Sequence, residues 1–518
     1  MGNKKNIMSR IKSALISVSD KSNLKKLLKV LKKNRIKIIS SGGTFQEIKK
    51  LKFDCLEIAN FTGFDEILNG RVKTLHPKIH AGILNIRKNK SHLKDLKKNN
   101  YENIDLVIVN FYPFKQILNK GENHDKIIEN IDIGGPTLVR AAAKNYNDVT
   151  IITSITQYEE LIDQLEKLKG STSLEFRKRM SKLAFTETAY YDLIVSNYFN
   201  KITKTSFPEK KIFHGNLIEK LRYGENPHQK SAIYSQEKNF KLKKIHGKSL
   251  SYNNYNDIFS ALAISRSFPK NIGTVVIKHA NPSGASIIED KIESYKSAIA
   301  CDPLSSFGGV VSCNFKINKL LALEMGKIFL EVIIANGFDK NALKILKQKK
   351  NLRLIDASNL ELNEITKFNS FADSFLVQSS DNLFLSDKNF KVVSKKKPTK
   401  SQFYDLKFAF NICRYVKSNA IVLVDNKSTV GIGSGQPSRL DSCEIAINKM
   451  KKNFNRKHEI IAASDAFFPF VDGVEKLVQS GVSAIIQPYG SIRDKEIIRF
   501  ANAAGIILIF SKTRHFRH

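Results

Sequence analysis

The chain has 518 residues, 42% of them hydrophobic, which suits two to four folded domains with large cores. Its five cysteines are scattered and form no C-x-x-C pair, which argues against a zinc knuckle or redox motif and indicates reduced thiols in a cytoplasmic protein. No apolar run approaches the roughly 20 residues of a membrane span, and the basic N-terminal segment lacks the apolar core of a signal peptide.

The formal net charge is +36, and such a charge can mark a protein that binds nucleic acid. The lysines, however, are spread over expected helical faces and loops, as in LKKLLKVLKK (24–33). We interpret most of them as a solvated surface that tolerates phosphorylated substrates, and we expect no specific nucleic acid partner. A basic nucleic-acid-binding protein is the alternative, which steeply salt-dependent duplex binding would distinguish.

Near the N-terminus, SALISV (13–18) predicts a buried strand, and residues 23–33 predict an amphipathic helix with apolar side chains at i, i+3, i+4 and i+7. Further buried strands are expected at 36–40, 104–110 and 148–154. Strands that alternate with helices predict a parallel sheet covered by helices on both faces. Ligands of such sheets bind at the carboxyl ends of the strands.

Polar residues follow three of these strands. Ser19 and Lys21 come after the first, the SSGGT segment (40–44) after the second, and Asn110 ends the third. Backbone N–H groups, hydroxyls and a lysine counter-charge together predict a phosphate cradle. The Gly-Gly loop alone would equally fit an ordinary tight turn.

The polar stretch 201–214 breaks the periodicity and predicts a linker between a domain at 1–200 and one at 215–518. A lysine-rich stretch at 387–402 divides the second domain into two parts. Strands are expected within this domain at 273–279, 308–315, 371–378, 420–425, 482–488 and 505–510.

One of these strands ends in an adjacent Lys278-His279 pair, after which residues 281–284 (NPSG) are expected to turn the chain sharply. The ammonium disfavours protonation of the neighbouring imidazole, so the pair predicts an acid/base site in which the histidine is the base. A surface lysine beside a structural histidine is the alternative.

The following motifs stand in this order along the chain: ALISVSDK (14–21), SSGGT (40–44), GRVKTLHPKIHAGIL (70–84), NFYPF (110–114), IDIGGPTLVRAAAKN (131–145), LRYGENPHQ (221–229), LSYNN (250–254), VVIKHANPSG (275–284), SSFGG (305–309), GIGSGQPSR (431–439) and SDAFFPF (464–470). Together they closely resemble a family of bifunctional purine-biosynthesis enzymes. That family joins phosphoribosylaminoimidazolecarboxamide (AICAR) formyltransferase to inosine monophosphate (IMP) cyclohydrolase. The resemblance spans nearly the whole chain.

The resemblance implies an α/β fold: a methylglyoxal-synthase-like, doubly wound parallel sheet at 1–200 for the cyclohydrolase, and a pair of cytidine-deaminase-like three-layer subdomains at 215–518 for the transformylase. It implies formyl transfer from the cosubstrate 10-formyltetrahydrofolate to the 5-amino group of AICAR, then dehydrative ring closure of the product FAICAR to IMP. A cytoplasmic homodimer without a membrane partner is implied. The deaminase zinc signature is absent, so no metal is expected to be required for catalysis.

For ring closure, the resemblance assigns Lys73 and Tyr112 to the developing oxyanion, Lys144 to proton exchange, and Asp132 to holding a lysine and the carboxamide. The residues expected to bind the nucleotide and its phosphate in this domain are Ser19, Lys21, Ser41, Gly43, Thr44, Arg71, Thr74 and Asn110.

For formyl transfer, we assign His279 as the base, Lys278 as electrostatic stabiliser or proton donor to the folate, and Asn419 as the group that orients the histidine or the formyl oxygen. By resemblance, further contacts to the nucleotide come from Arg222, Tyr223, Gly308, Glu331 and Arg514, and those on the folate side come from Arg439, Leu440, Asp472 and Ser491.

The aromatic side chains of SDAFFPF (464–470) could enclose a pterin ring. The family usually carries arginine after this motif, where this chain has Val471, so a positive charge near the folate side is lost. An enzyme with a weakened transformylase and only the N-terminal cyclohydrolase active is therefore the second alternative.

Overall fold

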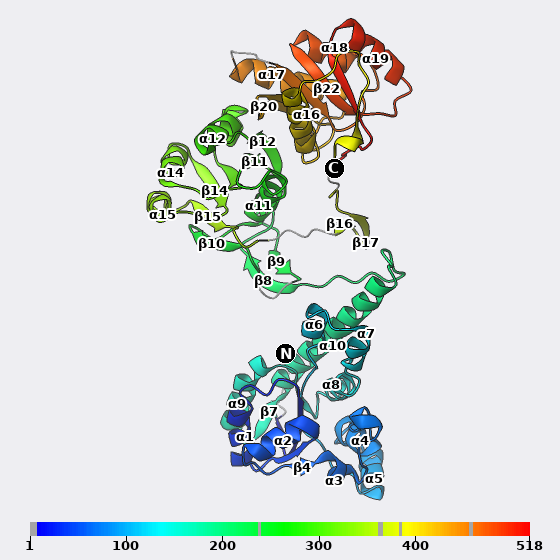
Figure 1. The fold of residues 1–518 in the computed structure, drawn as a ribbon. Coiled ribbons are helices and arrows are strands. Elements are labelled where there is room, and N and C mark those ends of the chain that lie inside the picture. Colours follow the sequence, from blue (N-terminus) through cyan, green and yellow to red (C-terminus); the bar gives the residue numbers. More distant parts are fainter. Residues whose placement is uncertain (1–7, 237–239, 361–365, 383–385, 455–458) are drawn as a thin grey trace. The chain divides into compact units, whose positions relative to one another are not determined.

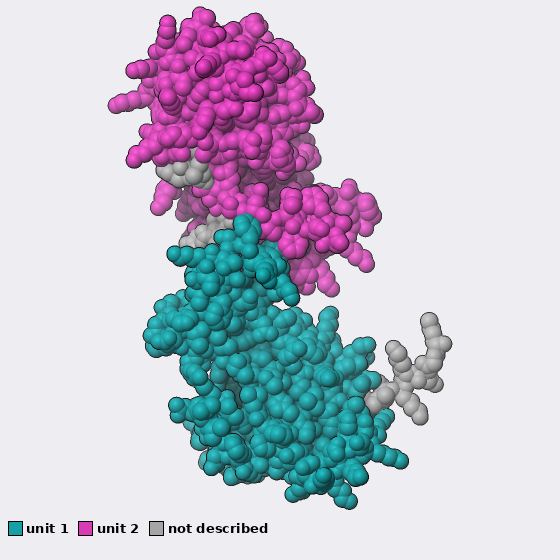
Figure 2. Space-filling model, turned by 90° about the vertical axis from the view of Figure 1, so that its right-hand side faces the viewer, with its two compact units in different colours: residues 1–214 teal, residues 215–518 magenta. Residues whose placement is uncertain are grey.

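The computed structural model describes residues 8–236, 240–360, 366–382, 386–454 and 459–518. It divides into two compact units, residues 1–214 and 215–518, which Figure 2 colours separately. Each hydrophobic core cluster draws its described residues from one unit only. No helix of the described part of the chain is long and apolar enough to cross a membrane.

The first unit, coloured blue to cyan-green in Figure 1, is built on a five-stranded sheet of order β4-β3-β2-β5-β6, in which all neighbours are parallel. This confirms the parallel sheet and the four strands expected from the apolar runs. Their residues are almost all buried because helices cover the sheet. The strands are β2 (Ser13–Val18), β3 (Lys37–Ser40), β4 (Leu56–Glu57), β5 (Leu106–Asn110) and β6 (Thr150–Ile152).

The predicted amphipathic helix is α1 (Leu24–Lys33), whose buried residues lie on one face. The long helix α10 (Leu174–Ile202) packs on α8 and extends into the stretch predicted as a linker. The remaining elements are β1 (Met8–Arg10), α2 (Gly42–Lys50), α3 (Ile58–Thr62), α4 (Pro77–Leu84), α5 (Lys90–Lys98), α6 (Phe114–Asn119), α7 (His124–Glu129), α8 (Gly134–Lys144), α9 (Tyr158–Lys167), β7 (Ser171–Ser173) and two short 3₁₀ helices at Leu68–Gly70 and Ile155–Gln157.

The second unit contains a twelve-stranded sheet of order β10-β15-β14-β13-β11-β12-β20-β19-β21-β22-β23-β18. The two six-stranded halves have the same pattern when each is followed from its edge to the centre. An antiparallel edge strand is followed by three mutually parallel strands and then by an antiparallel hairpin. The halves meet where β12 pairs with β20. The two similar α/β halves implied by the resemblance are therefore confirmed.

Helices cover both faces of this sheet, which makes three layers. The helices α11 and α16 share one continuous core cluster that spans both halves, whereas the opposite face is split into one cluster per half. The helices are α11 (Tyr252–Ser265), α12 (Lys291–Ala300), α13 (Pro303–Ser306), α14 (Lys319–Met325), α15 (Lys340–Leu346), α16 (Lys400–Cys413), α17 (Arg439–Asn453), α18 (Asp472–Gln479) and α19 (Asp494–Ala503).

The strands of the large sheet are β10 (Lys243–His246), β11 (Thr274–Lys278), β12 (Asn281–Ser286), β13 (Gly309–Cys313), β14 (Leu330–Ala335), β15 (Arg353–Asp356), β18 (Phe390–Val392), β19 (Ile421–Asp425), β20 (Ser428–Gly433), β21 (Ile460–Ser464), β22 (Val482–Pro488) and β23 (Ile507–Ser511). Outside it, β8 (Asn216–Leu221) pairs with β9 (Ser231–Ser235), and a 3₁₀ turn covers Asp387–Asn389. The single strand expected at 371–378 is instead an exposed hairpin of β16 (Thr366–Phe371) and β17 (Ser374–Ser379), because Ala372 adopts a positive φ and reverses the chain.

The sharp turn expected at NPSG lies two residues earlier. Lys278 pairs directly with Asn281, so His279 and Ala280 form a two-residue hairpin loop with φ of 51° and 58°. Two consecutive left-handed residues define the loop type that matches strand twist. The NPSG residues belong to β12, where the register shifts by one residue and accommodates the missing N–H of Pro282.

The same loop geometry recurs in the second half. Asn426 and Lys427, with φ of 44° and 63°, join β19 to β20. In both halves an aspartate from the preceding helix accepts a hydrogen bond from the second loop residue: Asp257 from Ala280 N at 2.7 Å, and Asp405 from Lys427 N at 3.2 Å. The two aspartates occupy the same position of α11 and α16, the sixth helical residue.

Burial raises the pKa of Asp405 to about 6, so this carboxyl keeps its proton in the folded chain at pH values where it has lost it in the unfolded chain. Its stabilising contribution is therefore present at pH 4 and is lost as the pH rises through 6. We expect Asp405→Asn, which retains an acceptor oxygen, to raise the free energy of unfolding relative to wild type by up to about 3 kcal/mol at pH 7.5.

The measurement is denaturant unfolding at pH 4.5 and 7.5. The advantage of the variant should be larger at pH 7.5. Asp373→Asn, at an exposed carboxyl of the β16–β17 hairpin, is the control for the loss of one carboxyl group. An equal effect at both pH values would contradict the account.

Candidate active sites

In the first unit, two lysines flank the start of a helix. Helix α2 begins directly after β3, and Gly42, at its first position, has a φ of +51°. A Cβ added to Gly42 would lie 3.3 Å from Lys73 Nζ, and one added to Gly43 would lie 3.9 Å from Lys21 Nζ. Two ammonium groups beside the backbone amides of a nine-residue helix make this end suited to an anion such as a phosphate.

Three other residues expected at this cradle lie at or next to the ends of β3 and β5 or in the first turn of α2. The hydroxyl of Thr44 donates to Val18 O at 2.9 Å and accepts from Val18 N at 3.0 Å. Asn110 Oδ1 accepts from Ser19 N at 2.6 Å and from Asp20 N at 2.9 Å. Ser41 is buried next to them, in the position that precedes α2. The Thr44 and Asn110 side chains therefore hold the end of β2 and the loop that follows it.

A second group of polar residues adjoins this cradle through Lys73. The carboxylate of Asp132 accepts a hydrogen bond from Gly135 N at 2.8 Å, and the Tyr112 backbone and Lys73 also favour its charged form. Burial outweighs them and raises the pKa of Asp132. A Cβ at Gly135 would lie 2.5 Å from Asp132 Oδ2, so any larger residue here would displace this carboxylate.

The hydroxyl of Thr74 reaches the same turn, because a Cβ added to Gly134 would lie 2.7 Å from it. The structure thus brings together four of the residues predicted for ring closure or substrate binding: Lys73, Thr74, Tyr112 and Asp132.

Two predicted residues stand apart from this group. Arg71 forms a two-point ion pair with Glu129 at the surface. Lys144 is exposed at the last position of α8, about 15 Å along the helix axis from Gly134 at its first position. Their expected roles stay predictions.

In the second unit, Lys278 and His279 form a corner at the end of β11, and backbone carbonyl groups fix the lysine side chain. Lys278 Nζ donates to the carbonyl oxygens of Phe307 at 2.9 Å and Gly308 at 3.2 Å. Gly308 has a φ of +67°, and a Cβ there would lie 3.2 Å from that ammonium group. His279 is exposed in the hairpin loop. The corner therefore presents an accessible imidazole beside a fixed positive charge.

The second half of the unit reaches the same edge of the sheet. Ser286 of β12 pairs with Ser428 of β20 in antiparallel fashion, so the carboxyl end of β20 lies level with the amino end of β12. Asn281 connects the two halves of the unit directly. Its Nδ2 donates to His279 O in the first half at 3.3 Å, and its Oδ1 accepts from Lys417 N in the second half at 3.2 Å.

By the same register, the segments that follow β20, β21 and β22 and precede β13, β14 and β19 all open on this edge. These segments, together with the start of β14, carry most of the residues predicted for the transformylase: Gly308, Glu331, Asn419, Arg439, Leu440, Asp472 and Ser491.

Asn419 and Arg439 contact one another. Arg439 donates to Asn419 Oδ1 at 2.8 Å and to Ser464 Oγ at 2.7 Å, and it forms a buried ion pair with Asp465. Asn419 Nδ2 donates to the carbonyl oxygens of Gln436 and Pro437, both at 2.9 Å. These contacts fix the loop that lies nearest to Asn281.

Three of the predicted residues make contacts with neighbouring side chains. Glu331 accepts from Asn254 at 3.0 Å and pairs with Arg353 at 3.3 Å. Exposed Arg222 lies over the ring of Tyr223, and exposed Arg514 over that of Phe516.

The aromatic residues of SDAFFPF (464–470) differ in their burial. Phe468 belongs to the core, whereas exposed Phe470 lies under the guanidinium of Arg493 at 4.6 Å. Phe467 is partly buried.

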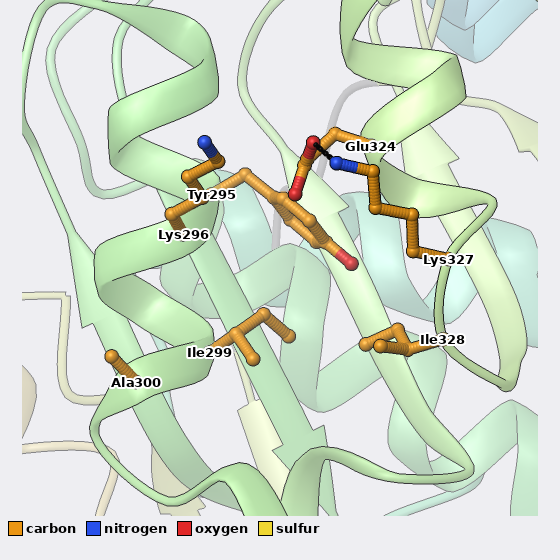
Figure 3. Close-up of a pocket in the computed structure, with 7 residues that line it drawn as sticks. All are labelled: Tyr295, Lys296, Ile299, Ala300, Glu324, Lys327 and Ile328. Atoms are coloured by element: carbon orange, nitrogen blue, oxygen red, sulfur yellow. Dashed lines mark hydrogen bonds and ion pairs between the residues drawn. The ribbon is translucent and has the colours of Figure 1, made fainter.

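A cavity of about 160 Å³ lies elsewhere in this unit, between α12 and α14 (Figure 3). It contains none of the predicted site residues, so it plays no part in the proposed chemistry. Its lining consists of Tyr295, Lys296, Ile299, Ala300, Glu324, Lys327 and Ile328. Within the described ranges, no three His, Cys, Asp or Glu side chains are grouped as a metal ion would require.

Sequence reasoning missed several residues at the Lys278-His279 corner. Asp257 binds the loop, Asn281 joins the two halves, and the rings of Phe307 and Phe329, 5.4 Å apart, flank Gly308. Phe307 and Asn281 lie inside recognised motifs and could have been singled out. Asp257 lies three residues beyond LSYNN and carries no signal of its own.

An anion cradle beside a buried carboxyl on one unit, and an exposed Lys-His corner on the other, define a two-site α/β enzyme. Two family models match the chain: the AICARFT/IMPCHase bienzyme over residues 142–449 and the MGS-like domain over residues 23–137. The chain belongs to the AICARFT/IMPCHase bienzyme family. It is a bifunctional enzyme of purine biosynthesis that combines AICAR formyltransferase and IMP cyclohydrolase.

Relatives named bifunctional purine biosynthesis protein PurH match along its length. That of Bradyrhizobium diazoefficiens is 42% identical over 524 residues, which covers 98% of this chain and 99% of the relative. That of Persephonella marina is 43% identical over 518 residues, or 98% and 100% of the two chains. Among solved structures, the crystal structure of ForH is 29% identical, covers 36% of this chain and 99% of its own, and has a TM-score of 0.33.

Proposed function

We propose that the second unit transfers the formyl group of 10-formyltetrahydrofolate to the 5-amino group of AICAR, and that the first unit closes the product, FAICAR, to IMP. The observation that carries the assignment is the exposed His279 imidazole beside the fixed Lys278 ammonium, at the sheet edge where both halves of the second unit meet.

In formyl transfer, the 5-amino nitrogen of AICAR attacks the formyl carbon, and the bond from that carbon to N10 of the folate breaks. The amine is a weak nucleophile because its lone pair is delocalised toward the carboxamide. His279 accepts the proton that the amine loses, while Lys278 stabilises the oxyanion and supplies the proton that N10 gains. Asn419 is proposed to orient the formyl oxygen from the opposite half.

In ring closure, the carboxamide nitrogen of FAICAR attacks its formyl carbon, and the formyl oxygen leaves as water. Lys73 and Tyr112 are placed to stabilise the oxyanion, and Asp132 holds the carboxamide nitrogen. The phosphate occupies the start of α2 between Lys21 and Lys73. Lys144 is proposed as the proton-exchanging group, which requires its side chain to reach back along α8.

The proposal also covers the oligomeric state, the location and the role of the net charge. A homodimer, with the transformylase site shared between subunits, is inferred from the family resemblance. A cytoplasmic location is supported by the five cysteines, which are all free and four of them buried. The charge of +36 favours association with the anionic nucleotide and folate.

The test is an absorbance assay that follows the two half-reactions separately on the purified chain. Folate-dependent formylation of AICAR and folate-independent cyclisation of added FAICAR are both expected. A fragment of residues 1–214, which has its own core clusters, should retain only cyclisation.

Cyclisation without formylation in the full chain would support the weakened transformylase, in which Val471 stands where the family has arginine. Neither reaction, together with steeply salt-dependent duplex binding, would support the nucleic-acid-binding alternative.

A further inference from the structure

We propose that Asp257 is a positioning residue for formyl transfer: by binding the Ala280 amide, its carboxylate fixes the hairpin loop that aims His279 at the substrate. The inference rests on the proposed function, because it takes His279 as the base. Asp257 contacts the loop and not the reacting atoms, so its effect would be transmitted through the backbone of the loop.

The loop adopts a backbone conformation that needs support. His279 and Ala280 both adopt left-handed φ values, which residues with a Cβ rarely adopt without support. Asp257 Oδ1 accepts from Ala280 N at 2.7 Å, and Asn281 Nδ2 donates to His279 O at 3.3 Å. The first bond fixes the peptide group that follows His279, and thereby the direction in which the imidazole projects.

The other end of this bond is held in a well-anchored helix. Asp257 lies in the second turn of α11, whose capping box is formed by Ser251 and Asn254. Asn254 also donates to Glu331 at 3.0 Å, and Glu331 pairs with Arg353. The loop is therefore anchored to a capped helix that packs on β11 and β13. Anchoring of this kind keeps a base within the narrow range of geometry that proton transfer needs.

The second half of the sheet contains an equivalent aspartate–loop contact. Asp405 makes the same bond to Lys427 N in the β19–β20 loop. That loop precedes Ser428, which pairs with the far end of β12, so it lies about 20 Å from His279 at the opposite edge of the sheet. The chain thus carries the same structural bond twice, once at the candidate active site and once remote from it. A comparison of the two separates positioning from folding.

The experiment measures steady-state formyl transfer by Asp257→Ala, Asp257→Asn and Asp405→Ala in the full chain. Asp257→Ala should lower kcat by about 10- to 100-fold with the KM for AICAR changed by less than about threefold, because alignment and not binding is lost. Asp257→Asn keeps an acceptor oxygen and should restore kcat to within about fivefold of wild type. Asp405→Ala removes the matching bond and should leave kcat within about twofold.

Any one of three results would overturn the proposal. Wild-type kcat in Asp257→Ala shows that the bond is dispensable. Equal losses in Asp257→Asn and Asp257→Ala assign the effect to charge and not to the amide contact. Equal losses in Asp405→Ala and Asp257→Ala show a general effect on the sheet.

Cyclisation of added FAICAR, measured on the same samples, reports the integrity of the first unit, and circular dichroism reports that of the second. If His279→Ala retains formyl transfer, the proposed role of His279 as the base fails, and this inference fails with it. If His279→Ala is inactive and Asp257→Ala is fully active, only this inference is overturned.

Discussion

His279→Ala is expected to lower formyl transfer by at least about 100-fold, the usual scale for the loss of a general base. The imidazole is exposed in the β11–β12 loop, with the Lys278 ammonium held next to it by two carbonyl oxygens. Cyclisation of added FAICAR should not change, because the residues proposed for that step lie in the other unit. Rapid-quench or absorbance measurements of formylation with saturating folate would give the rate.

The matched control is Asn426→Ala, because Asn426 occupies the equivalent position of the β19–β20 loop, with a φ of 44°. It removes a polar side chain from the same loop type without touching the proposed site. Near-wild-type formylation in His279→Ala would exclude this imidazole as the base. A loss of similar size in Asn426→Ala would assign the effect to loop conformation.

Much of the first unit follows from its sequence, because each buried strand is a short apolar run that ends in polar residues. The side chains at the ends of β2, β3 and β5 could be placed at one edge for that reason alone. What they do there could not be predicted. Thr44 and Asn110 were expected to bind substrate, yet their polar atoms contact the backbone at the end of β2 and in the loop that follows it. Such long-range hydrogen bonds leave no local pattern.

In the second unit, the Lys278-His279 pair could be recognised because it follows an apolar strand directly. The loop itself was misplaced, since Pro and Gly in NPSG are stronger turn signals than His-Ala. Tertiary contacts prevail here: the Asp257 hydrogen bond stabilises a left-handed alanine that local propensity disfavours. Asn419 and His279 lie at the same edge of the sheet because β12 pairs with β20. This pairing joins residues that are 142 positions apart in the sequence.

Lys73→Ala is expected to slow cyclisation of added FAICAR by about 100-fold or more, the scale for removing a group that stabilises an oxyanion. Lys73 Nζ lies beside Gly42 at the start of α2 and also favours the ionised form of Asp132, so its removal affects both the cradle and the carboxyl. Since burial already raises the pKa of Asp132, loss of this cation should raise it further. The acid side of the pH–rate profile should therefore move to higher pH.

Lys144→Ala is expected to slow cyclisation as well, but to leave the acid side of that profile in place, because Lys144 lies about 15 Å along α8 from the start of the helix. Formylation must be followed separately, since cyclisation pulls its equilibrium forward and net flux would fall in either variant. Lys94→Ala, an exposed lysine of α5, is the control for loss of surface charge. If Lys73→Ala and Lys144→Ala both cyclise FAICAR at the wild-type rate, the fold of the first unit stands and its assigned chemistry fails. If only Lys144→Ala cyclises FAICAR at the wild-type rate, Asp132 or water exchanges the proton instead of Lys144. The cluster of Lys73, Tyr112 and Asp132 then suffices for ring closure.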